Sequence, residues 1–460
     1  MSQMHHFLKQ VDLPVSVETA FAWHERTGAF QRLTPPWEPV EVIDKTGNIR
    51  DGDTLIAKVK AIVQQDLHAR HEGYIQHVQF QDRQVKGPFA SWFHSHRFER
   101  LGDQQSRLID DINYELPMGK LGEVFGDGFV KSKLEAMFKY RHQILKADLV
   151  RHAQYADRPR LKILVTGASG LVGSQLCAFL STGGHDVSVL VRSPSKLRLY
   201  HEIHWDIRQR QLDSSQLEGF DAIVHLAGEN IAAGRWTKEV KEKIRASRVE
   251  STTLLSETLA KLANPPKVLV SASASGFYGD RGNEVLSENS PAGKGFLPET
   301  CIDWENATRA AKEKGIRIVH PRFGIILSAA GGALAKMLSP FKLGAGGVVG
   351  SGKQFWSWIV LDDVIYAIHD LIQNEAYSGP VNFSSPESPT NREFTDALGQ
   401  VLSRPTIVPA PAFALKMMFG EMAEALLLAS TRMEPSQLKD TGFRYEYPDL
   451  KSALKHVLGE

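Results

Sequence analysis

The first 115 residues contain short runs in which hydrophobic and polar positions alternate often enough to predict strands. These runs are Phe7–Val15, Leu55–Val63, Tyr74–Phe80, Trp92–Glu99 and Arg107–Glu115. After the first run, Val17, Phe21 and His24 share one face at helical spacing and predict a short helix. From about Glu123 to Arg151, hydrophobic residues recur every three or four positions and predict one long amphipathic helix. Strands followed by such a helix indicate an α+β domain in which an antiparallel sheet wraps on a helix.

A polar, proline-bearing segment, residues 154–160, is interpreted as a linker, and beyond it the pattern changes to buried strands alternating with helices. The predicted strands are Lys162–Val165, Asp186–Val191, Ala222–Leu226, Val268–Ser271 and Ile316–Pro321, and the predicted helices are Val172–Leu180, Lys238–Leu262 and Glu299–Lys314. This alternation predicts an α/β domain with a Rossmann-type, doubly wound parallel sheet. The domains are therefore expected at 1–153 and 161–404, with a C-terminal helical module at 405–460.

Composition excludes several classes of function. Lys and Arg total 54 and Asp and Glu total 53, so the formal net charge is +1 and no nucleic-acid partner is expected. Two cysteines, Cys177 and Cys301, exclude a disulfide framework and a Cys-based zinc site. The most apolar stretch, Ala412–Ser430, is interrupted by charged residues, so no membrane span is predicted. The N-terminus lacks a signal-peptide pattern, and we expect a cytoplasmic protein.

The strongest candidate site is the glycine-rich turn Thr166-Gly-Ala-Ser-Gly-Leu-Val-Gly173, which follows a buried strand and opens a helix. Gly167 suits a tight turn, Gly170 a close approach to a pyrophosphate, and Gly173 close packing of helix on strand. The pyrophosphate would lie at the helix N-terminus, where free N–H groups favour anions. The residues expected at this dinucleotide site are Gly167, Ser169, Gly170, Leu171, Val172 and Gly173. The alternative is a glycine-rich turn that binds no ligand.

Arg192 decides the choice of dinucleotide. About 20 residues beyond the last glycine, NAD-specific sites place an acid that binds the ribose hydroxyls. Here the second strand ends instead in Val191-Arg192, and a guanidinium suits a 2′-phosphate. The sequence therefore favours NADP(H) as the cofactor, with a solvated strand-end cation as the alternative.

Two further motifs are given structural interpretations. The segment Gly347–Lys353 has the skeleton of a P-loop, but the hydroxyl residue after the lysine and a preceding buried strand are missing. We expect a flexible loop near the substrate region and no ATP site. Asp362 and Asp363, at a predicted strand-to-helix junction, are expected to cap the helix.

Several motifs together resemble the extended short-chain dehydrogenase/reductases, and in particular their atypical, NAD(P)-dependent epimerase-like branch. They are Thr166–Gly173, His225-Leu-Ala-Gly-Glu-Asn230, Ser271-Ala-Ser-Ala-Ser-Gly-Phe-Tyr-Gly279, Arg235-Trp236, Ser247-Arg248, Asp303-Trp-Glu305 and Gly350-Ser-Gly-Lys-Gln354. The resemblance runs from about 161 to 458. It implies that Arg192, Leu226, Ala227, Arg248 and the region of Ile326 line an NADP(H) site.

The N-terminal part resembles the START-like (SRPBCC) ligand-binding domains, which have a helix-grip fold around an apolar cavity. The likeness rests on the Pro14–Phe21 segment, the Leu33-Thr-Pro-Pro36 turn and the final long helix. It implies a small-molecule ligand of hydrophobic character.

One departure from the short-chain dehydrogenase pattern concerns catalysis. Most members use a Tyr-x-x-x-Lys pair, in which the lysine lowers the tyrosine pKa. Here the helix that should carry the pair has Cys301 near the tyrosine position and Glu305 near the lysine position. The candidates for catalysis that remain are Ser273, Tyr278 and Glu305. Ser273 matches the family's catalytic serine but could equally cap a strand end, and Tyr278 is better explained by packing than by acid catalysis.

His94 and His96 share one face of a predicted strand, and two imidazoles there could bind a metal ion. No third ligand at a readable spacing follows, so no metal site is predicted. The expected function is an NADP(H)-dependent reductase or epimerase. The alternative is a non-catalytic sensor or carrier whose ligand binding depends on NADP(H). The pattern leaves the substrate and the oligomeric state open.

Overall fold

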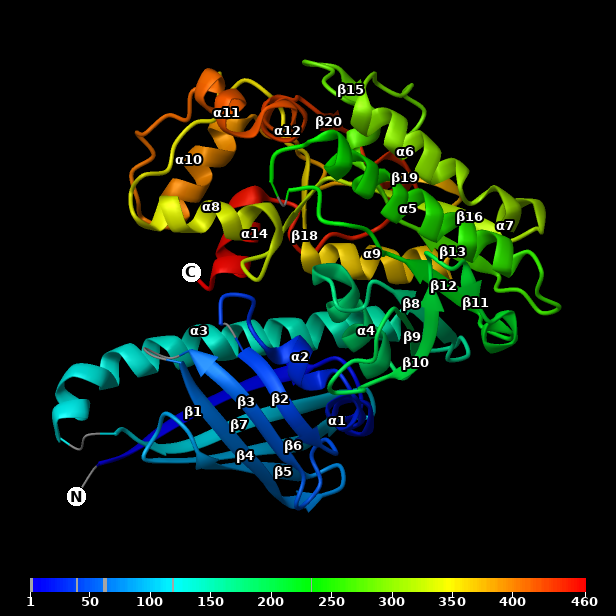
Figure 1. Ribbon diagram of the computed structural model, residues 1–460. Helices are drawn as coiled ribbons and strands as arrows, with labels where there is room; N and C mark the ends of the chain where they lie inside the picture. The colour runs from blue at the N-terminus through cyan, green and yellow to red at the C-terminus, as the bar shows by residue number, and fades with distance from the viewer. Residues whose placement is uncertain (1–2, 39, 61–63, 118–119, 233) are drawn as a thin grey trace.

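The chain forms two α/β bodies that meet along a layer of helices (Figure 1). The computed structural model describes residues 3–38, 40–60, 64–117, 120–232 and 234–460. The N-terminal domain runs from the first strand to the long helix α3 (Lys120–Ala153), and the dinucleotide domain begins at β8 (Lys162–Thr166). Among the described residues, no helix combines the length and apolar character that crossing a membrane requires.

Seven antiparallel strands form the sheet of the N-terminal domain, in the spatial order β1-β7-β6-β5-β4-β3-β2. They are β1 (Met4–Leu13), β2 (Val40–Thr46), β3 (Thr54–Lys60), β4 (Gln64–Ile75), β5 (Gln79–Lys86), β6 (Ser91–Gly102) and β7 (Gln105–Glu115). Helix α1 (Val17–Glu25) begins at its N-cap Ser16, whose hydroxyl accepts a hydrogen bond from the Thr19 N–H. The short helix α2 (Ala29–Leu33) follows, and α3 lies across the sheet (Figure 1).

Alternation of side chains explains the core of this domain, because every second residue of a strand faces the helices. Phe98 and Leu108 from neighbouring strands pack with Phe21 of α1 and Leu145 of α3 in one buried cluster. The sheet and its helix grip therefore enclose a shared interior, as the α+β prediction requires.

Two predicted elements of the chain are wrong in their limits. The run Tyr74–Phe80 is not one strand, because the chain reverses between β4 and β5 at a turn where His77 has a φ of 61°. The predicted helix Glu299–Lys314 is two helices, α6 (Phe296–Asn306) and α7 (Arg309–Glu313). The strand predicted at Leu55–Val63 is observed to Lys60 in β3, and 61–63 lie outside the described residues.

The dinucleotide domain contains a parallel sheet in the order β10-β9-β8-β12-β13-β16-β19, the doubly wound arrangement that the sequence predicts. Its strands are β8, β9 (Asp186–Val191), β10 (His201–Asp206), β12 (Ala222–His225), β13 (Val268–Ser271), β16 (Arg317–Phe323) and β19 (Gly379–Phe383), with the short strands β11 (Gln211–Leu212) and β14 (Ser273–Ala274) at its margins. Its helices are α4 (Leu171–Thr182), α5 (Lys238–Leu259), α6, α7 and α9 (Leu361–Gln373). Neither β10 nor β19 is among the strands predicted from the sequence.

Both faces of this sheet are covered, which explains why its strands are continuously hydrophobic. In β8, Val165 packs in the cluster that contains Phe179 of α4 and Ile365 of α9. The residue between, Leu164, packs on the opposite side with Leu255 of α5. The sheet therefore lies between two helix layers.

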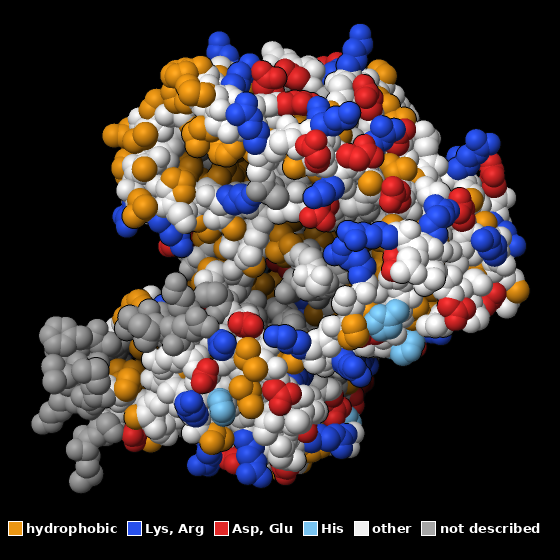
Figure 2. All heavy atoms as spheres, viewed as in Figure 1, with side chains coloured by type: hydrophobic (Ala, Val, Ile, Leu, Met, Phe, Trp, Pro, Cys, Tyr) orange, Lys and Arg blue, Asp and Glu red, His pale blue; other side chains and the backbone are white. Residues whose placement is uncertain are grey.

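The other small elements lie beside this sheet. They are α8 (Gly332–Lys342), the strand pairs β17 (Ile325–Leu327) with β18 (Trp358–Val360) and β15 (Val285–Leu286) with β20 (Arg432–Met433), α10 (Asn391–Val401), α11 (Ala412–Phe419), α12 (Glu421–Ala423), the π-helical turn Glu424–Leu428, α13 (Ser436–Asp440) and α14 (Leu450–Leu458). Hydrophobic side chains gather on the surface over α11 (Figure 2). They include Phe413, Met417 and Met418, which are more than half exposed.

Helix α2 of the N-terminal domain packs directly against α4 of the dinucleotide domain. At Gly28 the two backbones approach so closely that a Cβ atom would lie 2.6 Å from the Cα of Ala178. Next to this contact, the buried guanidinium of Arg32 forms ion pairs with Asp148 of α3 at 2.7 Å and with Asp362 of α9 at 3.0 Å. The residues of the predicted linker are also tied to α9, through Tyr155 to Asp370 and Arg158 to the Gln373 carbonyl.

Asp362 and Asp363 do not cap α9, which corrects the prediction for this pair. The N-cap position is Val360, and both aspartates are buried within the first turn. Asp362 pairs with Arg32 and with His456 of α14, whereas Asp363 accepts the backbone N–H groups of Glu446 and Tyr447. Both carboxylates therefore join distant parts of the chain.

Candidate functional site

The glycine-rich turn joins β8 to α4 with the geometry of a phosphate-binding loop. Gly167 has a φ of 70°, and its carbonyl accepts the Gly170 N–H at 2.9 Å. A Cβ atom on Gly173 would lie 2.3 Å from the Gly167 oxygen, so only glycine fits there. Ser169 and Gly170 are exposed at the start of α4, where the first N–H groups of a helix lack carbonyl partners. Leu171 and Val172 follow in the first turn and are half-buried.

A buried series of hydrogen bonds holds the end of β12 against this loop. The Thr166 hydroxyl oxygen accepts the N–H groups of Leu226 at 3.1 Å and Ala227 at 3.2 Å. The same hydroxyl lies 2.7 Å from His225 Nδ1, and His225 Nε2 lies 3.0 Å from the Thr252 hydroxyl of α5. Burial lowers the pKa of His225 to about 4, so the imidazole is neutral. Leu226 and Ala227 are therefore held beside Gly167.

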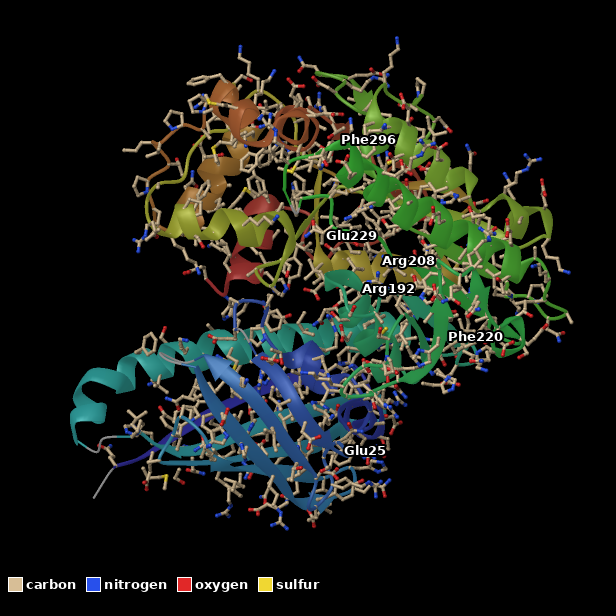
Figure 3. All side chains as sticks on the ribbon, viewed as in Figure 1. Glu25, Arg192, Arg208, Phe220, Glu229 and Phe296 are labelled. Atoms are coloured by element: carbon tan, nitrogen blue, oxygen red, sulfur yellow. The ribbon has the colours of Figure 1, made fainter. Side chains whose placement is uncertain are left out.

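Arg192 lies exposed immediately after β9, at the carboxyl edge of the sheet. Strands β9 and β10 pair in parallel, so the residues that follow them share this edge. Arg208, in the turn after β10, is a second exposed cation there, and Figure 3 labels both arginines. Sequence analysis missed Arg208 because it follows a strand that was not predicted.

Arg248 and Ile326 occupy different surroundings. The Arg248 guanidinium donates to the carbonyls of Ile244 and Glu229, each at 2.9 Å, and lies over the Trp304 ring. It therefore anchors the loop after β12, where Figure 3 labels Glu229. Ile326 lies in β17. Gly332 lies between β17 and α4, because a Cβ atom placed on Gly332 would be 3.6 Å from the Ile326 carbonyl oxygen and 3.7 Å from the Leu171 side chain. Ile326 is thus close to the start of α4.

The three candidates for catalysis meet around Arg322 of β16. The Ser273 hydroxyl donates to Glu305 at 2.7 Å, and Arg322 binds both Glu305 oxygens at 2.9 Å. Arg322 also donates to the Tyr278 hydroxyl at 3.0 Å, and that hydroxyl donates to Asn382 at 2.7 Å. Sequence analysis missed Arg322, because an arginine inside a buried strand gives no spacing signal.

The charges in this network are fixed by pairing. Burial raises the pKa of Glu305, but the hydrogen bonds and charge of Arg322 outweigh burial and lower it below the usual range. Burial raises the pKa of the fully buried Tyr278 phenol. Burial also raises the pKa of the Cys301 thiol to about 12, so this thiol is no nucleophile near neutral pH. Glu305 at the lysine position is therefore a paired anion, and Tyr278 is packed rather than free to exchange protons.

A cavity of about 510 Å³ lies where the two domains meet, beside the glycine-rich turn. The N-terminal domain contributes Phe30 and Trp37, and the dinucleotide domain contributes Leu171, Gln175 and Leu327. Figure 2 shows the surface hollowed between the two domains. The cavity adjoins the first turn of α4, so a ligand in it would lie close to the predicted dinucleotide.

The segment Gly347–Lys353 does not connect a strand to a helix, so it lacks the architecture of a P-loop. The Ala410 N–H donates to the Val348 carbonyl, and the Gly350 N–H donates to the Ala410 carbonyl. The segment therefore joins the C-terminal elements to the rest of the domain.

Three family matches divide the chain. Residues 163–382 match the NAD dependent epimerase/dehydratase family, and residues 13–138 match the polyketide cyclase/dehydrase and lipid transport family. Residues 410–457 match a domain of unknown function, DUF1731. An epimerase family protein of Mycobacterium bovis is 40% identical over 296 residues, which are 64% of this chain and 97% of the relative. Human epimerase family protein SDR39U1 is 34% identical over 301 residues, 65% of this chain and 100% of the relative.

Two solved structures extend the comparison. A nucleoside-diphosphate sugar epimerase from Corynebacterium glutamicum superposes with a TM-score of 0.81 at 33% identity, covering 98% of this chain and 90% of that chain. The structure of human SDR39U1 with NADPH superposes with a TM-score of 0.60 at 33% identity, covering 65% of this chain and 99% of that chain.

The Rossmann sheet and its glycine-rich turn, behind a helix-grip domain, define a dinucleotide-binding protein of the short-chain dehydrogenase class. More narrowly, the chain belongs to the epimerase family of these relatives. Both resemblances predicted from the sequence, to that family and to the START-like domains, are confirmed. The NAD dependence in the family's description and the NADPH in the human relative's structure agree with the predicted cofactor class.

Proposed function

We propose that the chain binds NADP(H) at the β8–α4 turn and acts on a small hydrophobic molecule held at the domain junction. The observation that carries this proposal is the junction cavity, which is lined by both domains and reaches Leu171 of the glycine-rich turn. The match of residues 13–138 to a lipid transport family supports a hydrophobic ligand.

The residues around the turn fit a dinucleotide. The exposed backbone of Ser169 and Gly170 receives the pyrophosphate, and Gly173 keeps α4 close enough to β8 for that approach. Leu226 and Ala227, held by Thr166, form the opposite wall. Arg192 and Arg208 supply positive charge for the 2′-phosphate. A bound NADPH would supply a hydride for reduction of a carbonyl, whereas epimerisation would need NADP⁺ to remove a hydride first and the resulting NADPH to return it to the other face.

A second function, a non-catalytic NADP(H)-dependent sensor or carrier, is favoured by the Arg322 network. The Ser273 hydroxyl donates to Glu305, and Tyr278 is fully buried and bonded to Asn382. A catalytic acid must reach the proton it transfers in a bound substrate. In this arrangement, Ser273 and Glu305 would position the strand end rather than exchange protons.

Incubation of the purified protein with NADPH and a library of hydrophobic carbonyl compounds and nucleotide sugars separates the two functions. Consumption of NADPH with one compound, followed by absorbance and mass spectrometry, supports the enzyme. Bound but unconsumed NADPH, together with a ligand that alters its affinity, supports the sensor. Failure of calorimetry to detect any binding of NADPH or NADH would contradict both.

A further inference from the structure

A buried cluster of histidines and aspartates lies inside the N-terminal domain, apart from the dinucleotide site. Asp82 comes from β5, His94 and His96 from β6, Asp110 from β7, and His142 from α3. Sequence analysis recognised the two histidines of β6 and found no third ligand. The third group comes from a neighbouring strand, which sequence spacing cannot reveal.

Strand register explains why these side chains meet. Asp82 pairs directly with His94 across β5 and β6, and His96 pairs directly with Asp110 across β6 and β7. Directly paired residues point to the same side of a sheet, and residues two apart in one strand do so as well. The common side is the one that α3 crosses (Figure 1), and His142 of α3 reaches Asp110 there. His94 and Asp110 are each 2% exposed and His96 is 8% exposed.

The contacts to Asp82 have the spacing of metal ligands. Its Oδ2 atom lies 3.3 Å from His94 Nδ1 and 3.2 Å from His96 Nε2, and the three ligand atoms lie within 4.8 Å of one another. Charged hydrogen bonds between such groups usually have donor–acceptor distances of about 2.7–2.9 Å. Two atoms bound at about 2.0–2.1 Å to one tetrahedral zinc ion are roughly 3.3 Å apart. The Asp82 contacts therefore match shared coordination better than a closed ion pair.

Asp110 lies next to the other ring nitrogens of the same histidines. Its Oδ1 atom lies 2.9 Å from His94 Nε2 and 2.9 Å from His96 Nδ1, and its Oδ2 atom lies 2.6 Å from His142 Nε2. Histidines that bind a metal usually donate the opposite ring N–H to a carboxylate, which fixes the tautomer and raises ligand basicity. Asp110 occupies that supporting position for His94, whereas its 2.9 Å contact with His96 Nδ1 lacks hydrogen-bond geometry.

The surroundings of the cluster favour a cation. Phe80 stacks on His96 at 4.1 Å, and Phe138 contacts the His94 ring edge-on at 5.5 Å, so the two imidazoles lie among aromatic rings. One divalent ion would balance the charge of both carboxylates.

We propose that Asp82, His94 and His96 bind a divalent metal ion of the zinc type inside the helix-grip domain. Asp110 and His142 act as positioning residues behind the two imidazoles. Three protein ligands leave a fourth coordination position for water or for an oxygen atom of a ligand bound in this domain. Asp82 is 19% exposed, so the ion can reach the site from that side. The proposal does not depend on NADP(H) binding or on catalysis by the other domain.

The test uses the full-length protein, stripped with a chelator and titrated with Co²⁺ and then with Zn²⁺. We expect one Co²⁺ per chain with the strong visible absorption of tetrahedral cobalt, and its displacement by Zn²⁺. Asp82→Asn, which keeps the side-chain shape, should abolish this spectrum. Asp110→Asn should weaken Co²⁺ binding about 10- to 100-fold, because it removes the carboxylate that supports the His94 imidazole.

The matched control is Asp111→Asn, since Asp111 is the next residue of β7 and binds the half-exposed His6 and Arg97 instead. This variant should bind Co²⁺ as the wild type does. If Asp82→Asn fails to fold by circular dichroism, His96→Asn replaces it, and a Zn²⁺-induced rise in the wild-type Tm is measured beside it. Absence of Co²⁺ and Zn²⁺ binding, or binding that Asp82→Asn and His96→Asn retain, would overturn the proposal. NADPH titration of each variant reports separately on the proposed function.

Discussion

Arg192 is an exposed cation at the end of β9, where a dinucleotide's adenosine ribose is expected. Replacement by aspartate turns attraction for a 2′-phosphate into repulsion. A charged hydrogen bond contributes about 1.5–3 kcal/mol, so Arg192→Asp should weaken NADPH binding roughly 10- to 150-fold. The affinity for NADH should hold or increase, because the new carboxylate can accept a ribose hydroxyl. Calorimetric titrations of both cofactors measure the two effects.

The control for this variant is Lys261→Asp, which makes the same change of charge just beyond the end of α5. It should leave both affinities unchanged. Arg208→Asp should weaken NADPH alone if Arg208 shares the phosphate. Equal weakening of NADPH and NADH by Arg192→Asp would show that Arg192 has a structural role and would remove the main support for NADP(H).

His225 makes the stability of the dinucleotide domain depend on pH. Burial lowers its folded pKa to about 4, below the usual value near 6.5, so the unfolded chain binds more protons between these values. Stability is therefore fully present above pH 6.5 and decreases as the pH falls towards 4, by up to about 1.4 kcal/mol per pH unit. His225→Asn should lower stability at neutral pH but show a shallower acid dependence. Urea unfolding of both proteins across this range measures the slopes, and parallel slopes would contradict the assignment.

At the scale of elements, substitution of Gly28 tests whether the close packing of α2 against α4 supports the glycine-rich turn. Gly28 has a φ of 101°, and a Cβ atom there would collide with the backbone of Ala178. Gly52 has a φ of 88° with open space around it, so Gly52→Ala carries the backbone strain alone. We expect Gly52→Ala to cost about 1–2 kcal/mol and to leave NADPH affinity unchanged. Gly28→Ala should cost more and also weaken NADPH binding, since α4 carries the glycine-rich turn.

Urea unfolding and NADPH titration of the two glycine variants decide this point. Equal losses of stability, with unaltered NADPH affinity in both, would show that the α2–α4 contact does not support the turn.

The elements that sequence predicted well are those whose signal is local. The β8 strand, the turn Gly167–Gly173 and the start of α4 are consecutive, so their hydrophobic run and glycine spacing contain the whole motif. The Arg322 network and the pairing of Asp82 with His94 depend on strand register, which one sequence does not specify. The strand predicted at Tyr74–Phe80 is wrong because a turn without glycine or proline, at 76–78, separates β4 from β5.

At the scale of the whole molecule, Arg32 joins the two domains from within their contact. Its guanidinium is 1% exposed and forms ion pairs with both Asp148 and Asp362. Arg32→Met should lower the free energy of unfolding by about 3–5 kcal/mol, because the buried Asp148 would lose its only ionic partner among the described residues and Asp362 would keep only His456. We also expect a larger radius of gyration by small-angle X-ray scattering, since Asp362 belongs to the other domain.

The matched control is Arg83→Met, which removes an exposed pair with Glu72 and should change stability by at most about 1 kcal/mol. If Arg32→Met unfolds with the same free energy as Arg83→Met, the Arg32 pairs do not hold the domains together.

Helix α4 has one end at the dinucleotide turn and one side on the N-terminal domain, and Leu171 and Gln175 of the same helix line the junction cavity. A cavity ligand and a dinucleotide would thus contact a single rigid body. Thermodynamic reciprocity then applies: if the dinucleotide strengthens binding in the cavity by some factor, the cavity ligand must strengthen dinucleotide binding by the same factor. Under the proposed function, and where such coupling exists, the amount of either molecule would help to determine how much of the other the protein retains.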